Sequence, residues 1–226
     1  MSNWTLSLFL AVVLLPGWTL AADGRGEEIP GWGVLHDPVG DCPVDPVDSG
    51  ITLTIPAGIH DMSPRKGTAN APRIWQPVEG NFLYEVRVDT FPLPDAKSGA
   101  NGNTSYIAAG ILVWHDDDNF LRWTRSANGE SARVFLSCEH YQDGKLVGGG
   151  IYPIEDHAIY LRLERRGDHL YFSARRDAAN WRGFLKRPFS EETHAKLGVV
   201  GINVTQQNAT FALDKSYLLS AKQAAE

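Results

Sequence analysis

The stretch YIAAGILVWHDDDNFLRWTR, residues 106–125, contains two β-type runs joined by an acidic turn. In the first run, residues 106–114, apolar side chains occupy both alternating sets of positions, which is typical of a central strand covered on both faces. The turn DDDN at 116–119 ends this run, and a second run follows at 120–125. This stretch predicts two neighbouring strands near the middle of an all-β protein.

Similar short runs recur on both sides of this stretch, separated by turn signals. They lie at 51–55, 73–75, 82–88, 133–138, 146–152, 159–165, 169–175, 197–204 and 210–218. Asn128-Gly129 and Asp143-Gly144 favour tight hairpin turns, and the segment 166–168 (RGD) reads as a third hairpin. Only Ser190 to Leu197 looks helical, with Ser190 as the N-cap. The pattern predicts a two-sheet antiparallel β-sandwich.

Alternation within the runs predicts which side chains face the core. In 159–164 the core set is Ile159, Leu161 and Leu163, which sends Tyr160, Arg162 and Glu164 outward. In 133–140 the same rule turns Val134, Leu136 and Cys138 inward, and it places Arg133, Phe135, Ser137 and Glu139 on the opposite face.

The domain organisation follows from composition. Residues 1–22 resemble a signal peptide, with the apolar core LSLFLAVVLL at 6–15, which predicts a secreted or periplasmic protein after cleavage. Residues 23–50 are rich in Gly, Pro and Asp and predict an irregular N-terminal wrap. One sandwich domain is expected at 51–220, followed by a tail at 221–226.

Charge and hydropathy exclude some partners. The formal net charge is -6, with acidic and basic residues interspersed, and nucleic acid would require a basic face. After residue 22 no apolar run is long enough to span a membrane. The two cysteines, Cys42 and Cys138, form a disulfide if the fold brings them together, or else remain two buried thiols.

Four segments together resemble a known family. They are NFLYEVRVD at 81–89, the stretch 106–125 quoted above, IYLRLERRGDHLYFSARRDAANW at 159–181 and LGVVGINVTQQNATFALDKSYL at 197–218. The chain is similar to the concanavalin A-like domains found at the C-termini of bacterial β-xylosidases and in related stand-alone proteins. The resemblance implies a jelly-roll sandwich of the concanavalin A-like superfamily, associated with sugars and located outside the bacterial cytoplasm. The loop at 174–181 keeps only Asp177 and Trp181 of the turn usual in that family.

Carbohydrate recognition needs aromatic platforms together with a few polar groups that bind hydroxyls. The outward positions of 120–125, 133–139 and 159–164 predict one groove, with the turn 116–119 and the hairpin 141–145 as its rim. The candidate ligand-binding residues are Trp114, Arg122, Trp123, Glu139, Tyr141, Arg162 and Glu164. The same residues also fit a purely structural role, as core tryptophans and cross-strand ion pairs.

The leading hypothesis is therefore a non-catalytic module whose partner is a glycan or polysaccharide. One alternative is a glycoside hydrolase or lyase that uses Glu139 and Glu164, which requires carboxyl groups within about 10 Å of each other. The other is a cell-envelope domain that binds a protein partner through an exposed apolar patch.

Few other chemistries are indicated. The sequence lacks the serine-hydrolase elbow, the phosphate-binding loop, the dinucleotide fingerprint and the HExxH zinc motif. The seven histidines show no metal-ligand spacing, so we expect no zinc site and no cofactor. Asp116, Asp117 and Asp118 form either a solvated turn or part of a calcium site.

Overall fold

The computed structural model describes residues 26–189 and 195–220. The expected signal peptide at 1–22 and the tail at 221–226 lie outside the described residues. So does most of the helix expected at 190–197, and its last three residues belong to a strand.

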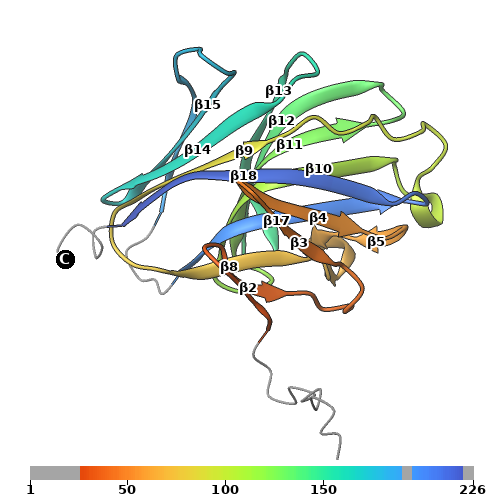
Figure 1. Cartoon of the computed structure of the whole chain (residues 1–226), viewed down its shortest axis with the longest axis horizontal. Helices are drawn as coiled ribbons and strands as arrows, with labels where there is room; N and C mark the ends of the chain where they lie inside the picture. The colour runs from red at the N-terminus through yellow and green to blue at the C-terminus, as the bar shows by residue number, and fades with distance from the viewer. Residues whose placement is uncertain (1–25, 190–194, 221–226) are drawn as a thin grey trace, which may run out of the picture.

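Among the described residues, two antiparallel sheets pack face to face (Figure 1). The large sheet has the order β1-β2-β8-β17-β10-β11-β12-β13, and β5 also pairs with β17. The small sheet has the order β16-β15-β14-β9-β18-β4-β3. The predicted antiparallel β-sandwich is therefore confirmed.

The strands of the large sheet are β1 (Glu28–Ile29), β2 (Gly33–His36), β5 (Gly58–His60), β8 (Arg73–Val78), β10 (Tyr106–Trp114), β11 (Phe120–Asn128), β12 (Arg133–Gln142), β13 (Lys145–Pro153) and β17 (Ala195–Thr205). Those of the small sheet are β3 (Val44–Val47), β4 (Gly50–Ile55), β9 (Phe82–Val88), β14 (Ile159–Arg166), β15 (His169–Arg175), β16 (Arg182–Pro188) and β18 (Ala209–Ser220). The remaining elements are β6 (Met62–Ser63), β7 (Thr68–Ala69) and two 3-10 helices, η1 (Pro64–Lys66) and η2 (Ala100–Gly102).

The N-terminal wrap is more regular than the sequence predicts. Although the segment is rich in Gly and Pro, β2 pairs with β8 in the large sheet and β3 pairs with β4 in the small one. The strand β3 tolerates Pro46 because it lies at the edge of the small sheet, where one side of the strand needs no ladder hydrogen bonds. The segment therefore extends both sheets instead of only covering them.

The space between the sheets is filled by the side chains that alternation assigns to the core. Leu161 and Leu163 of β14 are fully buried, as are Leu136 of β12 and Trp123 of β11. Trp123 makes ring contacts with Phe172 at 5.9 Å between centroids. Burial of such large apolar side chains provides most of the driving force for assembling the two sheets.

A second apolar cluster lies on the outer face of the large sheet, the face turned away from the small sheet. Residues 61–72, which include β6, η1 and β7, cross this face and are called the covering segment. Met62 and Ala71 of this segment are buried against Leu112 of β10 and Ile202 of β17. This face is consequently partly closed, which agrees with the apolar character of both sides of residues 106–114.

The hairpin tips follow local turn chemistry in one case and depart from it in another. Asp143 and Gly144 have φ angles of 50° and 69°, as the predicted tight turn requires. At Asn128-Gly129 the loop is longer, and the positive φ of 49° falls on Ala132. The Gly129 amide donates to the Ser105 carbonyl at 2.9 Å, which continues the pairing of β10 with β11 into the loop.

The two cysteines are free and buried, so the disulfide is not formed. Cys42 lies beside His60 of β5, which pairs with β17, whereas Cys138 belongs to β12. The strands β10 and β11 lie between β17 and β12, and three strand spacings amount to about 14 Å. A disulfide requires the two Cα atoms to lie within about 7 Å of each other.

Among the described residues, no helix is long and apolar enough to cross a membrane.

Candidate ligand-binding site

Three of the predicted site residues meet on the outer face of the large sheet. Arg122 of β11 lies directly opposite Glu139 of β12 in the register. Its Nη2 donates to Glu139 Oε2 at 2.7 Å, and the hydroxyl of Tyr141 donates to the same oxygen at 3.1 Å. Asp61 of the covering segment completes the group, with its Oδ1 3.6 Å from Arg122 Nη1. These four residues are called the polar cluster.

Burial determines the charge states within the polar cluster. Burial alone would lower the pKa of Arg122, but Glu139, Tyr106 and Asp61 outweigh it, so the pKa is raised and the guanidinium stays charged. Burial and the neighbouring Glu139 raise the pKa of Tyr141 to about 12, so its hydroxyl remains a donor. Within the described part of the chain, Nε of Arg122 has no acceptor.

Trp114 lies on the same face, beside the polar cluster. Its ring packs on that of Trp75 of β8 at 4.4 Å between centroids, and Lys196 Nζ lies 4.7 Å above it. Its indole Nε1 donates to Asp117 at 3.3 Å. Sequence reasoning missed Trp75, which reaches this face through the pairing of β8 with β17, and Asp61, which reaches it through the covering segment.

Trp123 has a different environment from the other predicted site residues. Its neighbour Arg122 points outward, so alternation turns Trp123 into the core, where none of its surface is exposed. Its indole Nε1 donates to the Ser173 carbonyl at 3.2 Å. Trp123 therefore presents no surface to a ligand.

Arg162 and Glu164 do lie on an outward face, as predicted, but on that of the small sheet. Arg162 binds Glu85 of β9 and lies 3.8 Å above the ring of Trp181. Glu164 is bound by Arg166 at 2.6 Å. The prediction of one groove made from all three runs is therefore wrong, because β14 belongs to the opposite sheet from β11 and β12.

This arrangement also separates the two carboxylates considered for hydrolysis. Glu139 and Glu164 project from the outer faces of opposite sheets. Packed sheets lie about 10 Å apart, and both side chains point away from the space between them. Their carboxyl groups are thus farther apart than the roughly 9.5 Å that the widest two-carboxylate mechanism uses.

The acidic turn at 116–119 is held by its own hydrogen bonds. Asp116 accepts bonds from the Asp118 amide at 2.9 Å and from the side chain of Asn119 at 2.8 Å. Asp117 instead binds Arg73 at 3.2 Å. The carboxylates are directed to different partners, so within the described residues the turn brings no three potential metal ligands together.

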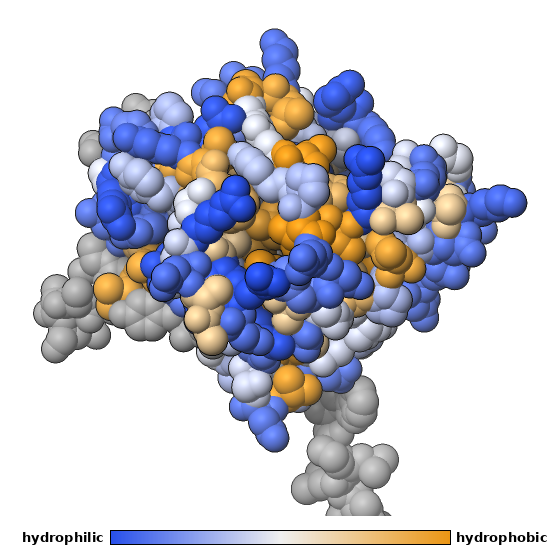
Figure 2. Space-filling view, turned by 90° about the horizontal axis from the view of Figure 1, so that it is seen from above, coloured by the Kyte–Doolittle hydropathy of each residue, from blue (hydrophilic) through white to orange (hydrophobic). Residues whose placement is uncertain are grey.

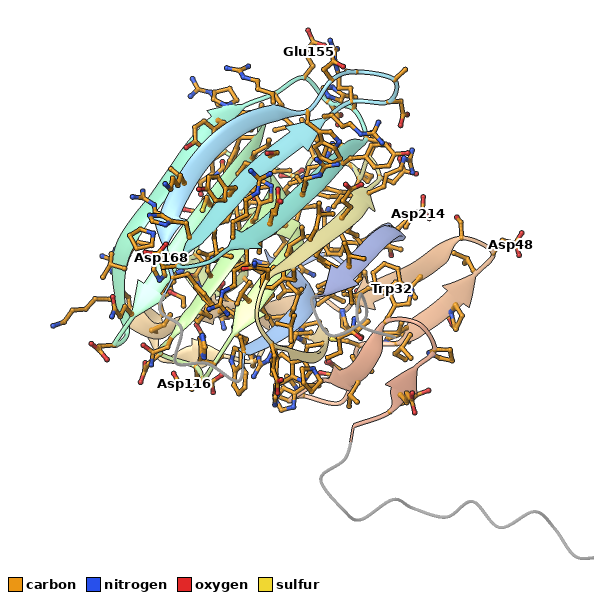
Figure 3. The ribbon with its side chains drawn as sticks, turned by 90° about the vertical axis from the view of Figure 1, so that its left-hand side faces the viewer. Trp32, Asp48, Asp116, Glu155, Asp168 and Asp214 are labelled. Atoms are coloured by element: carbon orange, nitrogen blue, oxygen red, sulfur yellow. The ribbon has the colours of Figure 1, made fainter. Side chains whose placement is uncertain are left out.

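A cavity of about 510 Å³ opens at the end of the sandwich where this turn lies, and is called the end cavity. Figure 3 shows Asp116 and Asp168, which belong to hairpins of opposite sheets, near this end and Glu155 at the other. The end cavity is lined by the ends of β10, β11, β12 and β16, by the turn between β10 and β11, and by β13. The lining residues are Val113, His115, Asn119, Phe120, Leu121, His140, Tyr141, Gln142, Val147, Arg187, Pro188 and Phe189.

Local backbone features shape the end cavity. The register of β12 and β13 shifts between His140 and Tyr141, a bulge that leaves Val147 as an extra residue on β13. The two predicted rim segments are joined, because the Gly144 amide donates to the Asp118 carbonyl at 3.0 Å. Tyr141 belongs to both the polar cluster and the end cavity, and its ring stacks on Phe120 at 4.8 Å.

Two histidines provide hydrogen-bonding groups in the end cavity. Burial, opposed by Asp116 and assisted by Arg165, lowers the pKa of His115. Burial and then Arg187 lower the pKa of His140. Both imidazoles are therefore neutral at pH 7, and a neutral imidazole offers one donor and one acceptor, as a sugar hydroxyl does.

Arg187 closes the cavity on the side of the small sheet. Its Nη2 donates to the Gly149 carbonyl of β13 at 3.3 Å, so it links the edges of the two sheets. Its Nε is buried without an acceptor among the described residues. The end cavity thus combines aromatic walls with neutral and cationic donors.

No protein-family model matches the sequence. No curated protein matches it in sequence either.

Solved structures resemble the fold. A functionally unknown protein from Saccharomyces cerevisiae superposes with a TM-score of 0.64 and 16% identity over 84% of this chain and 96% of that one. The GH43 BlXynB protein from Bacillus licheniformis gives 0.55 and 13%, over 75% of this chain and 33% of that one. The xylan β-1,4-xylosidase from Bacillus halodurans C-125 gives 0.53 and 12%, over 74% and 33%. The chain spans about a third of these two Bacillus proteins, and identities this low concern the fold alone.

Proposed function

We propose that this chain is an exported, non-catalytic carbohydrate-binding sandwich of the concanavalin A-like type, and that the end cavity holds the glycan. The fold likeness to one third of a xylan β-1,4-xylosidase supports an association with sugars. The observation that carries the proposal is the lining of the cavity. Its size falls within the usual 300–1,000 Å³ of small-molecule sites, and both aromatic and hydrogen-bonding side chains line it.

The residues take complementary roles in this proposal. The rings of Tyr141 and Phe189 provide apolar surfaces for the faces of a sugar ring. His140 and the exposed Gln142 bind hydroxyls. Arg122 and Glu139 act indirectly, since the bond from the Tyr141 hydroxyl to Glu139 fixes the ring that lines the cavity.

The test is a glycan array followed by calorimetric titration with the oligosaccharides that bind, xylo-oligosaccharides included. We expect His140→Ala and Gln142→Ala each to weaken binding about tenfold, the cost of one lost hydrogen bond to a ligand. Arg162→Ala, on the outer face of the small sheet, serves as the matched control and should bind as the unmodified chain does. No binding on the array, or binding lost only in Arg162→Ala, would contradict the proposal.

Protein binding at β13 is the second candidate function. This edge strand exposes Leu146, Val147 and Ile151, the last with 68% of its surface accessible. Figure 2 views the molecule from the top of Figure 1, where β13 and β15 lie. It shows an apolar area in the middle of that face, bordered by hydrophilic residues. If this surface is the functional one, Ile151→Glu abolishes partner capture and leaves glycan binding unchanged.

A further inference from the structure

Three potential metal ligands of different chemical kinds meet where the loop before β3 packs against β5. They are Asp41, Cys42 and His60, and one donor atom from each lies within 4.8 Å of the other two. His60 pairs with Asn203 near the end of β17, whereas the end cavity lies beyond the other end of that strand, where Lys196 pairs with Trp114. This cluster is therefore separate from the proposed glycan site.

One of the distances falls in the range found within a zinc coordination sphere, and the others are a little longer. Cys42 Sγ lies 3.3 Å from Asp41 Oδ1 and 3.8 Å from His60 Nδ1. Zinc binds sulfur at about 2.3 Å and nitrogen or oxygen at about 2.0–2.2 Å, so tetrahedral angles place the ligand atoms about 3.3–3.6 Å apart. The imidazole presents Nδ1 to Cys42 and Nε2 to Asp41, so binding an ion through one nitrogen requires the ring of His60 or the side chain of Asp41 to move.

Burial favours an ion that is held firmly but can still enter. Cys42 and His60 are each only 4% exposed. The Asp41 side chain is 42% exposed, so the cluster reaches solvent on that side. Both polar contacts of the imidazole are long, at 3.8 Å to the thiol and 3.9 Å to the carboxylate, so neither is a strong hydrogen bond.

The surrounding charge is negative. The carboxylates of Asp41 and Asp37 both contact Cys42, one at the thiol and the other at the backbone amide. Asp37 also holds the ligand loop in place, since its Oδ2 accepts the Cys42 amide hydrogen at 2.7 Å. A divalent cation that displaces the thiol proton would offset the negative charge of the thiolate and of these carboxylates.

We propose that Asp41, Cys42 and His60 form a zinc site whose fourth position is open to solvent beside Asp41. A set of one sulfur, one nitrogen and one oxygen donor favours zinc over the oxygen-seeking calcium and magnesium. The ion would tie the segment that precedes β3 in the small sheet to β5 of the large sheet. Its role is to fasten the N-terminal segment to the sandwich.

Cobalt titration of the full chain tests the site, after removal of metals with a chelator and in the presence of a reductant. We expect one equivalent of Co²⁺ to bind, with the visible bands of tetrahedral cobalt and a near-ultraviolet thiolate-to-cobalt band, and Zn²⁺ to displace it. Cys138→Ala removes the other buried thiol and is the matched control, which should keep both signals. Cys42→Ser should lose the thiolate band.

A second variant keeps the test independent of folding defects. Asp41 is partly exposed, so Asp41→Asn should leave the circular dichroism spectrum unchanged and lower zinc affinity at least tenfold, as measured by competition with a chromophoric chelator. The proposal is overturned if the unmodified chain shows no thiolate band. It is also overturned if Cys42→Ser keeps that band, or if folded Asp41→Asn binds zinc as tightly as the unmodified chain.

Discussion

Arg122 and Glu139 face each other on adjacent strands and form an ion pair of 2.7 Å, in which the Arg122 side chain is 6% exposed and that of Glu139 is 23% exposed. Asp61 of the covering segment approaches the same guanidinium, so one cation serves two carboxylates. This relationship couples the sheet to the segment that crosses it, and removing the cation affects both.

Arg122→Met should therefore destabilise the protein by about 2–4 kcal/mol, because two poorly solvated carboxylates lose their counter-charge. The measurement is urea unfolding followed by circular dichroism. The double variant Arg122→Met/Glu139→Gln should recover part of the loss. Arg166→Ala, which breaks an exposed pair with Glu164, should change little. A similar effect of the two arginine substitutions would argue against the structural role of the buried pair.

Trp123 and Trp181 should respond differently to truncation. Trp123→Ala removes a fully buried ring from between the sheets and should cost about 3–5 kcal/mol. Trp181 is only partly buried, beside Arg162, so Trp181→Ala should cost less than about 1 kcal/mol. Thermal unfolding of the two variants measures the difference, and equal losses would contradict the core position of Trp123.

Stability should fall as the pH decreases from 7.5 to 5. Burial lowers the pKa of His115 and His140 below the ordinary 6.5, so the unfolded chain binds protons in this range more readily than the folded one. His36 and His157 contribute in the same direction. Replacing His115 and His140 with Gln should flatten the dependence of the urea midpoint on pH. An unchanged slope in the double variant would show that these imidazoles are not the cause.

Thiol counting distinguishes the free cysteines from a disulfide. In the unfolded chain, without reductant, a maleimide should label both Cys42 and Cys138. In the folded chain both thiols are buried, so labelling should be slow and should follow local or global opening. A chain that labels only after reduction would show that the two sulfurs are bonded.

Local pattern was sufficient for much of the fold. Alternation in 159–164 and 133–139 allows only one orientation that buries Leu161 and Leu136, so the inward faces were predictable. Sheet membership was not, because the pairing of β14 with β9 joins residues far apart in sequence and leaves no local signal. The strand β16 was also missed, since most of its residues are at least partly exposed and do not form an apolar pattern.

The candidate sites likewise contain residues that could be grouped from the sequence and residues that could not. Arg122, Glu139 and Tyr141 could be grouped from the sequence because β11 and β12 are consecutive strands. Cys42 and His60 could not, because the cluster depends on a loop folding back over β5 and has no fixed spacing. The prediction of Trp123 as a ligand-binding residue is wrong, because alternation along β11 turns Trp123 inward when Arg122 faces outward.

The pairing of β4 with β18 sets the order in which the sandwich can be completed. Thr52 of β4 lies opposite Ala212 of β18, so β4 pairs early with β3 but must wait for the much later β18 on its other side. Until then an edge of β4 stays open to other chains, and closing so distant a contact is slow. Synthesis of β18, which directly follows the large-sheet strand β17, is therefore the step that closes this edge of β4.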